Sequence, residues 1–261
     1  MNRSVLFLFV TLSILLSGCM QSESEDVLSQ ARKAFISKEY SEAERFYQRY
    51  LRESQAGKER WEVWNRLIEI TGTVRGDKKG AIELFDAMLL EYAAEPERYK
   101  SILISKGELY IESGLWQDAA RTWLQVLSAP EVTVEQETLA YSNLGKAYLM
   151  QGDYGLAVDA FTDCRELAYH NLEHELLCIY DIAQAFAFLG NHTEAEQNLL
   201  ELLSKDTLND ELISRAKLLL ADIYEQQDQP QKAIVLLQEI REIYPNPRVI
   251  EFRLAHLQNK K

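Results

Sequence analysis

Residues 135–167 read EQETLAYSNLGKAYLMQGDYGLAVDAFTDCREL, and this stretch decides the fold. Its first half places large apolar side chains at helical spacing, and Gly152-Asp153 then interrupts the pattern as the end of a helix does. The second half resumes the helical spacing, and Gly145 and Ala157, which have almost no side chain, allow two antiparallel helices to cross closely. We therefore expect a helical hairpin, with Tyr148 and Phe161 filling the space above the crossing.

The hairpin recurs along the chain with a period of 38 residues. Alanine occurs six times at this spacing, as Ala43, Ala81, Ala119, Ala157, Ala195 and Ala233. Four positions after each alanine stands a bulky apolar residue: Tyr47, Phe85, Trp123, Phe161, Leu199 and Leu237. Five positions before each alanine stand Lys38, Gly76, Gly114, Gly152, Gly190 and Asp228. Registers that stay in phase over the whole chain indicate stacked repeats, each of which covers the apolar face of its neighbour.

The order of small residue, aromatic, glycine, aromatic, alanine and bulky apolar residue resembles the tetratricopeptide repeat. The resemblance covers about Glu25 to Pro245, and it is best in repeats three to six. It implies an all-α fold, a right-handed superhelical solenoid of six helix-turn-helix repeats, with about 13 helices including a C-terminal capping helix. The apolar positions of that capping helix are Val249, Ile250, Leu254 and Leu257.

The resemblance and the composition together divide the chain into segments. We expect a signal peptide at residues 1–18, a lipidated cysteine with a short tether at 19–24, six repeats over 25–245, and the capping helix and tail at 246–261. The expected repeats span about residues 24–61, 62–99, 100–137, 138–175, 176–213 and 214–245.

Two features depart from the family pattern. The family period is 34 residues, and the four extra residues here correspond to about one helical turn, so either a longer helix or longer connections account for them. In repeat two, Glu69 replaces the small residue and Gly72 the aromatic one, with a second glycine at Gly76. We expect this helix to be shortened or distorted, either because the repeat is degenerate or because it forms a hinge.

The N-terminal segment is typical of an exported protein. Arg3 precedes an apolar run from Val5 to Leu16, which suits a signal peptide and is shorter than the roughly 20 residues of a bilayer span. The following Leu16-Ser17-Gly18-Cys19 resembles the lipobox of bacterial lipoproteins, which implies acylation of Cys19. An ordinary signal peptide and an uncleaved anchor are the alternatives. Met20, where enterobacterial lipoproteins of the inner membrane carry Asp, favours the outer membrane, facing the periplasm.

Composition and motifs argue against catalysis and against nucleic-acid binding. The net charge of −13 repels a phosphate backbone. The sequence contains no phosphate-binding glycine loop, no nucleophile elbow and no HExxH motif. We therefore expect no enzyme activity, no catalytic residue, no cofactor, no resident metal and no small-molecule substrate, and we expect proteins or peptides as partners.

Two cysteines and two histidines form the most distinctive cluster. Cys164 and Cys178 lie seven residues on either side of Asn171, so a helical turn near Asn171 would place them at one level on facing helices. In an oxidising compartment this pair could form a disulfide. Two buried free thiols are an alternative, and zinc binding together with His170 and His174 is another.

The resemblance also implies a partner groove, because in this family the first helices of successive repeats line a concave surface. The matching positions in repeats three to five are Ser101, Ile104, Glu108, Ile111, Leu139, Ser142, Lys146, Leu149, Met150, Leu177, Tyr180, Gln184 and Phe188. Apolar residues at these places suit a bound peptide and equally suit a packed core. Two functions remain open: a scaffold for assembly of an outer-membrane or pilus/secretin complex, and an adaptor that regulates peptidoglycan enzymes.

Overall fold

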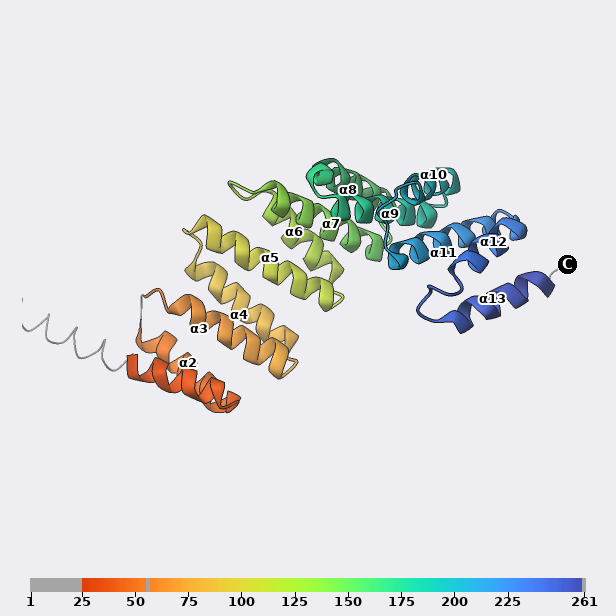
Figure 1. Ribbon diagram of the computed structural model, residues 1–261. Coiled ribbons are helices and arrows are strands. Elements are labelled where there is room, and N and C mark those ends of the chain that lie inside the picture. Colours follow the sequence, from red (N-terminus) through yellow and green to blue (C-terminus); the bar gives the residue numbers. More distant parts are fainter. Residues whose placement is uncertain (1–24, 55–56, 260–261) are drawn as a thin grey trace, which may run out of the picture. The chain divides into compact units, whose positions relative to one another are not determined.

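The computed structural model describes residues 25–54 and 57–259, which form helices joined by short connections (Figure 1). These two ranges contain thirteen α-helices and no strand: one helix over residues 25–36 and the twelve labelled α2 to α13. The all-α repeat fold is thus confirmed. The chain divides into two compact units, unit 1 at residues 1–102 and unit 2 at residues 103–261.

The helices follow one another as antiparallel pairs. In unit 1 the helix over residues 25–36 precedes α2 (Tyr40–Glu53), α3 (Arg60–Ile68), the π-helix η1 (Glu69–Val74) and α4 (Lys78–Glu91), and α5 (Pro96–Glu112) contains the boundary between the units. Unit 2 continues with α6 (Trp116–Leu127), α7 (Val134–Gln151), α8 (Tyr154–Leu167), the 3₁₀-helix η2 (Ala168–His170), α9 (Leu172–Leu189), α10 (His192–Leu203), α11 (Asp210–Gln226), α12 (Pro230–Ile240) and α13 (Pro247–Asn259). From α6 to α13 each helix packs on the next, and α9 also contacts α11.

The 38-residue period of the sequence is also the period of the helices. Each of the six register alanines lies in an even-numbered helix, and each is completely buried, with 0% of its surface exposed. The bulky residue four positions later is buried in every repeat as well. One period therefore corresponds to one pair of helices.

The turn between the two helices of a pair has the same backbone conformation in all six repeats. Positive φ angles occur at Lys38 (60°), Gly76 (71°), Gly114 (68°), Gly152 (85°), Gly190 (80°) and Asp228 (57°), which are the six positions five residues before the register alanines. Glycine adopts this left-handed conformation without a steric penalty, which explains its use in four repeats. Lys38 and Asp228 adopt it as well, so the turn geometry is a property of the repeat and not of glycine alone.

Glycine on the first helix allows the aromatic residue of the second to approach the backbone. A Cβ atom added at Gly145 would lie 2.5 Å from the ring of Phe161, and one at Gly107 would lie 2.8 Å from the ring of Trp123. Phe161 thus packs directly on Gly145, rather than only above the crossing. This close contact explains why both positions need a residue without a side chain.

The four extra residues of the period lie in the first helix of each pair. The first helices α5, α7, α9 and α11 have 17, 18, 18 and 17 residues. The second helices α6, α8, α10 and α12 have 12, 14, 12 and 11. Of the two explanations for the long period, the lengthened helix is therefore the correct one.

Repeat two contains the distortion expected from its two glycines. The α-helical geometry ends at Ile68, and residues Glu69–Val74 continue as the π-helix η1, which packs against α4. A Cβ atom at Gly72 would lie only 3.0 Å from that of Ala81. The close approach of η1 to α4 thus takes place at the glycine that replaces the aromatic residue.

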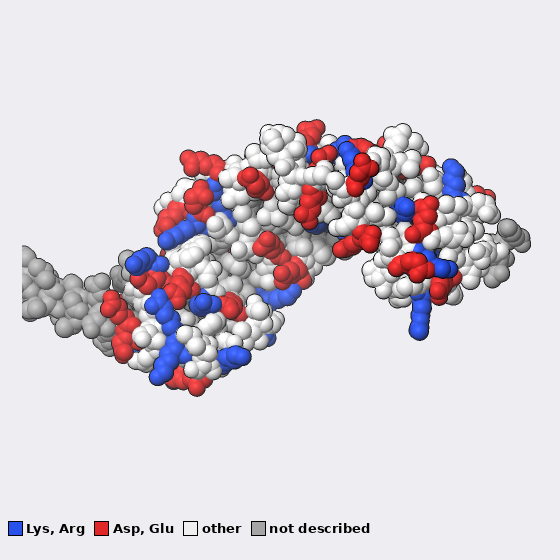
Figure 2. All heavy atoms as spheres, viewed as in Figure 1, with Lys and Arg blue, Asp and Glu red and all other residues white. Residues whose placement is uncertain are grey.

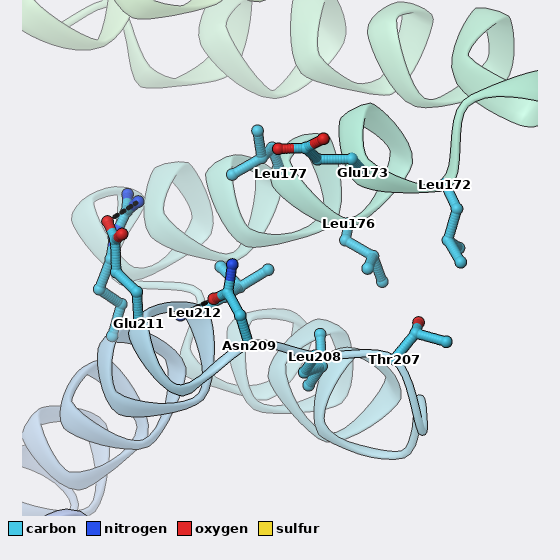
Figure 3. Close-up of a pocket in the computed structure, with 10 residues that line it drawn as sticks. Leu172, Glu173, Leu176, Leu177, Thr207, Leu208, Asn209, Glu211 and Leu212 are labelled. Atoms are coloured by element: carbon cyan, nitrogen blue, oxygen red, sulfur yellow. Dashed lines mark hydrogen bonds and ion pairs between the residues drawn. The ribbon is translucent and has the colours of Figure 1, made fainter. Parts of the chain in front are cut away.

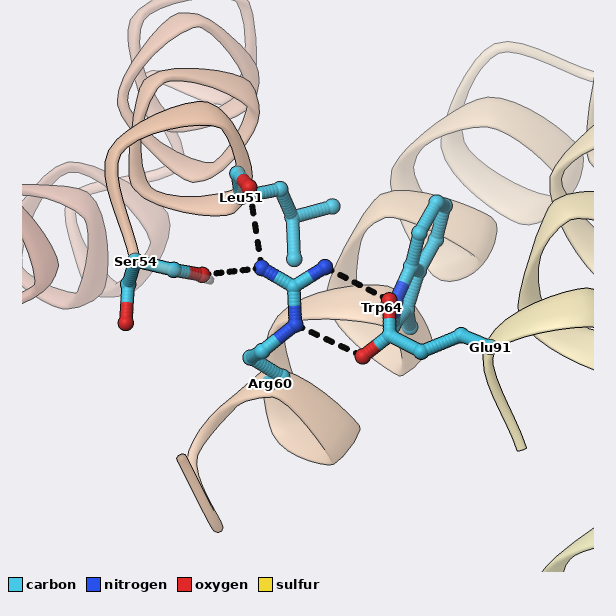
Figure 4. Close-up of polar contacts among 5 residues, drawn as sticks. All are labelled: Leu51, Ser54, Arg60, Trp64 and Glu91. Carbon is cyan, nitrogen blue, oxygen red and sulfur yellow. Dashed lines mark hydrogen bonds and ion pairs between the residues drawn. The ribbon is translucent and has the colours of Figure 1, made fainter. Parts of the chain in front are cut away.

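An arginine joins three helices of unit 1. Arg60, at the start of α3, donates to both carboxylate oxygens of Glu91 at the end of α4, with distances of 2.6 and 2.5 Å, and also donates to the carbonyl oxygens of Leu51 and Ser54 (Figure 4). Trp64 donates its indole N–H to Glu91 at 2.8 Å. Hydrogen bonding from Arg60 lowers the pKa of Glu91, so this carboxylate stays charged in the half-buried site.

The last helix covers the end of unit 2. Ile250 and Leu254 of α13 join the apolar core formed with α11 and α12, whereas 76% of Phe252 is exposed. Arg253 binds Asp222 of α11 at 2.5 Å and also pairs with Glu225. Among the described helices, none is both long enough and apolar enough to cross a bilayer.

Candidate partner-binding groove

Two clefts lie between α9 and α11, the first helices of repeats five and six. The N-terminal cleft has a volume of about 650 Å³ and is lined by Leu172, Glu173, Leu176, Leu177, Thr207, Leu208, Asn209, Glu211, Leu212 and Arg215. The C-terminal cleft has a volume of about 300 Å³ and is lined by Tyr180, Gln184, Ala187, Phe188, Arg215, Leu218, Leu219, Asp222, Gln226 and Tyr244. Arg215 lines both, so the two clefts meet at this residue, and together they form the α9–α11 groove.

Helical spacing explains why these residues share one surface. Tyr180, Gln184 and Phe188 follow one another at intervals of four on α9, which places them on one face of the helix. The residues 38 positions later are Leu218, Asp222 and Gln226 of α11, and all three line the C-terminal cleft. Equivalent positions of successive repeats thus face the same groove.

The N-terminal cleft has an apolar floor and a charged rim (Figure 3). Leu172 and Leu176 extend from α9 toward the loop that carries Thr207 and Leu208. Leu176 and Leu212 are buried, whereas Leu172 and Leu177 are 47% and 36% exposed. An apolar surface that water still reaches is typical of a binding site for another molecule.

Arg215 is held at the middle of the groove by its neighbours. Its guanidinium carbon lies 4.4 Å from the ring centroid of Tyr180, in a cation–π contact between the two helices. It also pairs with Glu211, one turn earlier on α11, at 3.9 Å. Burial raises the pKa of Tyr180, and the charge of Arg215 partly offsets this effect. The arginine is therefore part of the wall of the groove.

Two acidic groups beside the groove are easier to protonate than usual. Burial raises the pKa of Asp181 to about 6, although the charges of Lys146 and Arg215 act in the opposite direction. Burial also raises the pKa of Asp222, which Arg253 partly offsets through its charge and a hydrogen bond. Asp181 therefore titrates in a range in which few carboxylates do.

Most of the predicted groove residues are accessible. Of the thirteen, only Tyr180 is buried, with 6% of its surface exposed; the others are half-buried or exposed. Leu177, Tyr180, Gln184 and Phe188 line the two clefts, and those of α5 and α7 line neither. The α11 side of the groove was missed, because the carried-over positions stopped at repeat five. Its signal was present in the sequence, since Leu218 and Asp222 stand one period after Tyr180 and Gln184.

The structure joins the two cysteines of the predicted cluster. Cys164 of α8 and Cys178 of α9 are both buried and form a disulfide with their Cα atoms 6.1 Å apart. Asn171 caps the start of α9, so the turn lies midway between them. His170 and His174 are exposed, and no group of three or more possible metal-ligating side chains occurs among the described residues. Cys19, the predicted lipidation site, lies outside the described residues.

The groove lies in the part of the chain with a family match. The tetratricopeptide repeat profile matches residues 104–166 and 180–246. No curated protein matches the sequence significantly. Three solved structures have a similar fold. The apo form of the quorum sensor NprR from B. thuringiensis has a TM-score of 0.61 at 17% identity, over 92% of this chain and 72% of that chain. Pseudomonas aeruginosa PilF has a TM-score of 0.55 at 15% identity, over 93% and 99%. MamA has a TM-score of 0.53 at 21% identity, over 66% and 92%.

These matches describe a repeat that mediates contacts between proteins and not a catalytic domain. The solved structures are similar in fold alone, because all three are less than 25% identical to this chain. Over residues 104–166 and 180–246 the chain belongs to the tetratricopeptide repeat family, and its likeness to the fold of solved members extends over more than nine-tenths of its length.

Proposed function

We propose that the protein is a lipid-anchored scaffold of the bacterial envelope, which holds a segment of a partner protein in the α9–α11 groove. The observation that carries this proposal is the lining of the groove: equivalent positions of repeats five and six, Tyr180 with Leu218 and Gln184 with Asp222, face one cleft. Such a lining offers a regular series of apolar and polar contacts, as an extended or helical peptide requires.

The N-terminal sequence supports the place of action. The apolar run and Leu16-Ser17-Gly18-Cys19 would lead to export and to acylation of Cys19, and the short segment up to residue 24 would keep the repeats close to the membrane. The fold likeness to Pseudomonas aeruginosa PilF agrees with a role in assembly of an outer-membrane or pilus/secretin complex.

The anchor can be tested with the full-length protein expressed in bacteria. Labelling with a clickable palmitate analogue should give a labelled protein in the membrane fraction, and Cys19→Ser should abolish the label. Cys164→Ser is the control, because this residue is buried and bonded within the fold. Equal labelling of Cys19→Ser and the unchanged protein would show that the lipid anchor has been placed wrongly.

The scaffold function can be tested by purification from detergent-solubilised envelope. The variant Gln184→Arg with Leu218→Arg places charge in the C-terminal cleft, whereas Leu200→Arg does so at an exposed position of α10 outside both clefts. Barrel, pilus or secretin components that are lost only from the cleft variant would support the proposal. Peptidoglycan hydrolases or synthases lost in the same way would point instead to cell-wall regulation. Partners that remain bound to the cleft variant would contradict a role for the groove.

A further inference from the structure

The N-terminal cleft combines apolar contacts with a surplus of carboxylates. Leu172 and Leu177 present exposed apolar surface beside the buried Leu176 and Leu212. Glu173 and Glu211 stand on the two sides of this surface, one on α9 and the other on α11. We propose that this cleft binds a basic, leucine-containing amphipathic segment of the partner, an inference that rests on the proposed function and specifies the chemistry of its ligand.

The two helix ends at the cleft do not reverse its sign. The starts of α9 and α11 each contribute about half a positive charge. Their first turns contain four carboxylates, Glu173 and Glu175 on α9 and Asp210 and Glu211 on α11. The side chains of Asn171 and Asn209 already accept hydrogen bonds from the backbone N–H groups of His174 and Leu212, so capping uses part of the donor capacity. The local balance remains negative even with the charge of Arg215 included.

The charge of the whole unit acts in the same direction. Residues 1–102 contain 15 Lys and Arg against 16 Asp and Glu, a net charge of −1, whereas residues 103–261 contain 13 against 25, a net charge of −12. The charged side chains are distributed over the surface (Figure 2). An acidic unit attracts a basic segment at long range, while the apolar floor determines where that segment binds.

The same charge disfavours other occupants of the cleft. An acidic peptide and an anionic membrane surface would both be repelled by unit 2. A wholly charged basic segment would leave the exposed surface of Leu172 and Leu177 uncovered. A helix with leucines on one face and Lys or Arg on the other satisfies both requirements, because side chains three and four positions apart lie on one face.

The experiment begins with a displayed library of random 16-residue peptides, selected on the full mature protein in detergent. Cleft-dependent peptides are those whose binding is lost on Leu172→Ser with Leu177→Ser but retained on Leu200→Ser, an exposed leucine of α10. We expect these peptides to be enriched in Lys and Arg as well as in leucine. Circular dichroism of each variant checks that the fold is retained.

The second step measures the affinity of one enriched peptide by fluorescence anisotropy at low salt. Glu173→Gln with Glu211→Gln should weaken binding about fivefold to twentyfold, because two exposed charge contacts are removed. Asp159→Asn with Asp163→Asn changes the net charge of unit 2 equally but alters two exposed carboxylates of α8, and should change the affinity less than twofold.

The other outcomes distinguish the inference from the proposed function. Cleft-dependent peptides that are acidic or uncharged would overturn the inference and leave the segment-binding function intact. An equal loss of affinity in the two double variants would also overturn it, because the protein would then attract basic peptides only through its overall charge. A library without any cleft-dependent peptide would contradict both the inference and the function assigned to the groove.

Discussion

The guanidinium group of Arg215 on α11 stacks over the ring of Tyr180 on α9, with 4.4 Å between the guanidinium carbon and the ring centroid. This contact joins the first helices of two successive repeats at the point where the two clefts of the groove meet. It combines burial of the aromatic ring with a partly exposed charge. Stability and the shape of the groove therefore depend on the same pair of side chains.

Arg215→Ala should lower the free energy of unfolding by about 1 kcal/mol, the usual contribution of a partly buried cation–π contact. Arg215→Lys should restore less than half of this loss, because an ammonium group cannot stack as a planar guanidinium does. Urea unfolding followed by circular dichroism measures both effects. Arg241→Ala serves as the control, since Arg241 is exposed and pairs only with the adjacent Glu242 among its printed contacts. An equal loss in the control would show that the stacking contributes nothing.

Gly145→Ala should destabilise the protein by about 2 kcal/mol, because the added Cβ would lie 2.5 Å from the Phe161 ring and force a rearrangement of the helix pair. Gly155→Ala is a matched change on α8, where the added Cβ meets nothing within 4 Å. It should be neutral or stabilise by up to about 1 kcal/mol, since alanine favours a helix. Thermal unfolding compares the two variants, and similar effects of both would contradict the close helix crossing.

The Cys164–Cys178 bond should persist in exported protein. Mass mapping without reductant should find the two peptides joined, and replacement of both cysteines by serine should cost about 3 kcal/mol, the stabilisation expected for a closed loop of this length. Alkylation of both thiols without reductant would identify them as the two buried free thiols of the alternative interpretation.

Asp181 should make the protein less stable as the pH rises. Its pKa is about 6 in the folded protein and about 3.9 in an unfolded chain, so the folded state binds the extra proton between these values, and stability falls from about pH 4 to pH 6. Two pKa units correspond to about 3 kcal/mol, and partial exposure reduces the expected effect to about 1–2 kcal/mol.

Asp181→Asn removes this penalty. The variant should gain about 1–2 kcal/mol over the unchanged protein at pH 7.5 and nothing at pH 4, as measured by urea unfolding at both values. The exposed Asp206→Asn is the charge-matched control. A gain that is the same at both pH values would exclude titration of Asp181 as its cause.

Much of the architecture could be predicted from the sequence, because the same small set of residues recurs in every repeat. Ala119 and its five equivalents had to lie at helix crossings, and all are completely buried. The turn positions were also visible, although only the structure shows that Lys38 and Asp228 adopt the glycine-like conformation. Sequence alone left two explanations for the long period, since a helical turn and a four-residue loop have the same length in a sequence.

The groove was harder to predict for a physical reason. Apolar side chains on a first helix look alike whether they face a partner or the next repeat, and Tyr180 shows this, because Arg215 and the next helix bury it. Burial depends on which residue of the following repeat covers the position. The period located Leu218 and Asp222 opposite Tyr180 and Gln184, but their distances and the two clefts required coordinates.

The most direct test of the scaffold function is site-specific photocrosslinking in intact cells. A photoreactive amino acid at Gln184, inside the C-terminal cleft, should form adducts with one defined segment of an envelope protein, identified by mass spectrometry. The same amino acid at Leu200, 49% exposed on α10 and outside both clefts, should give no such adduct. Adducts with the same protein from Leu200 but not from Gln184 would contradict binding in the α9–α11 groove.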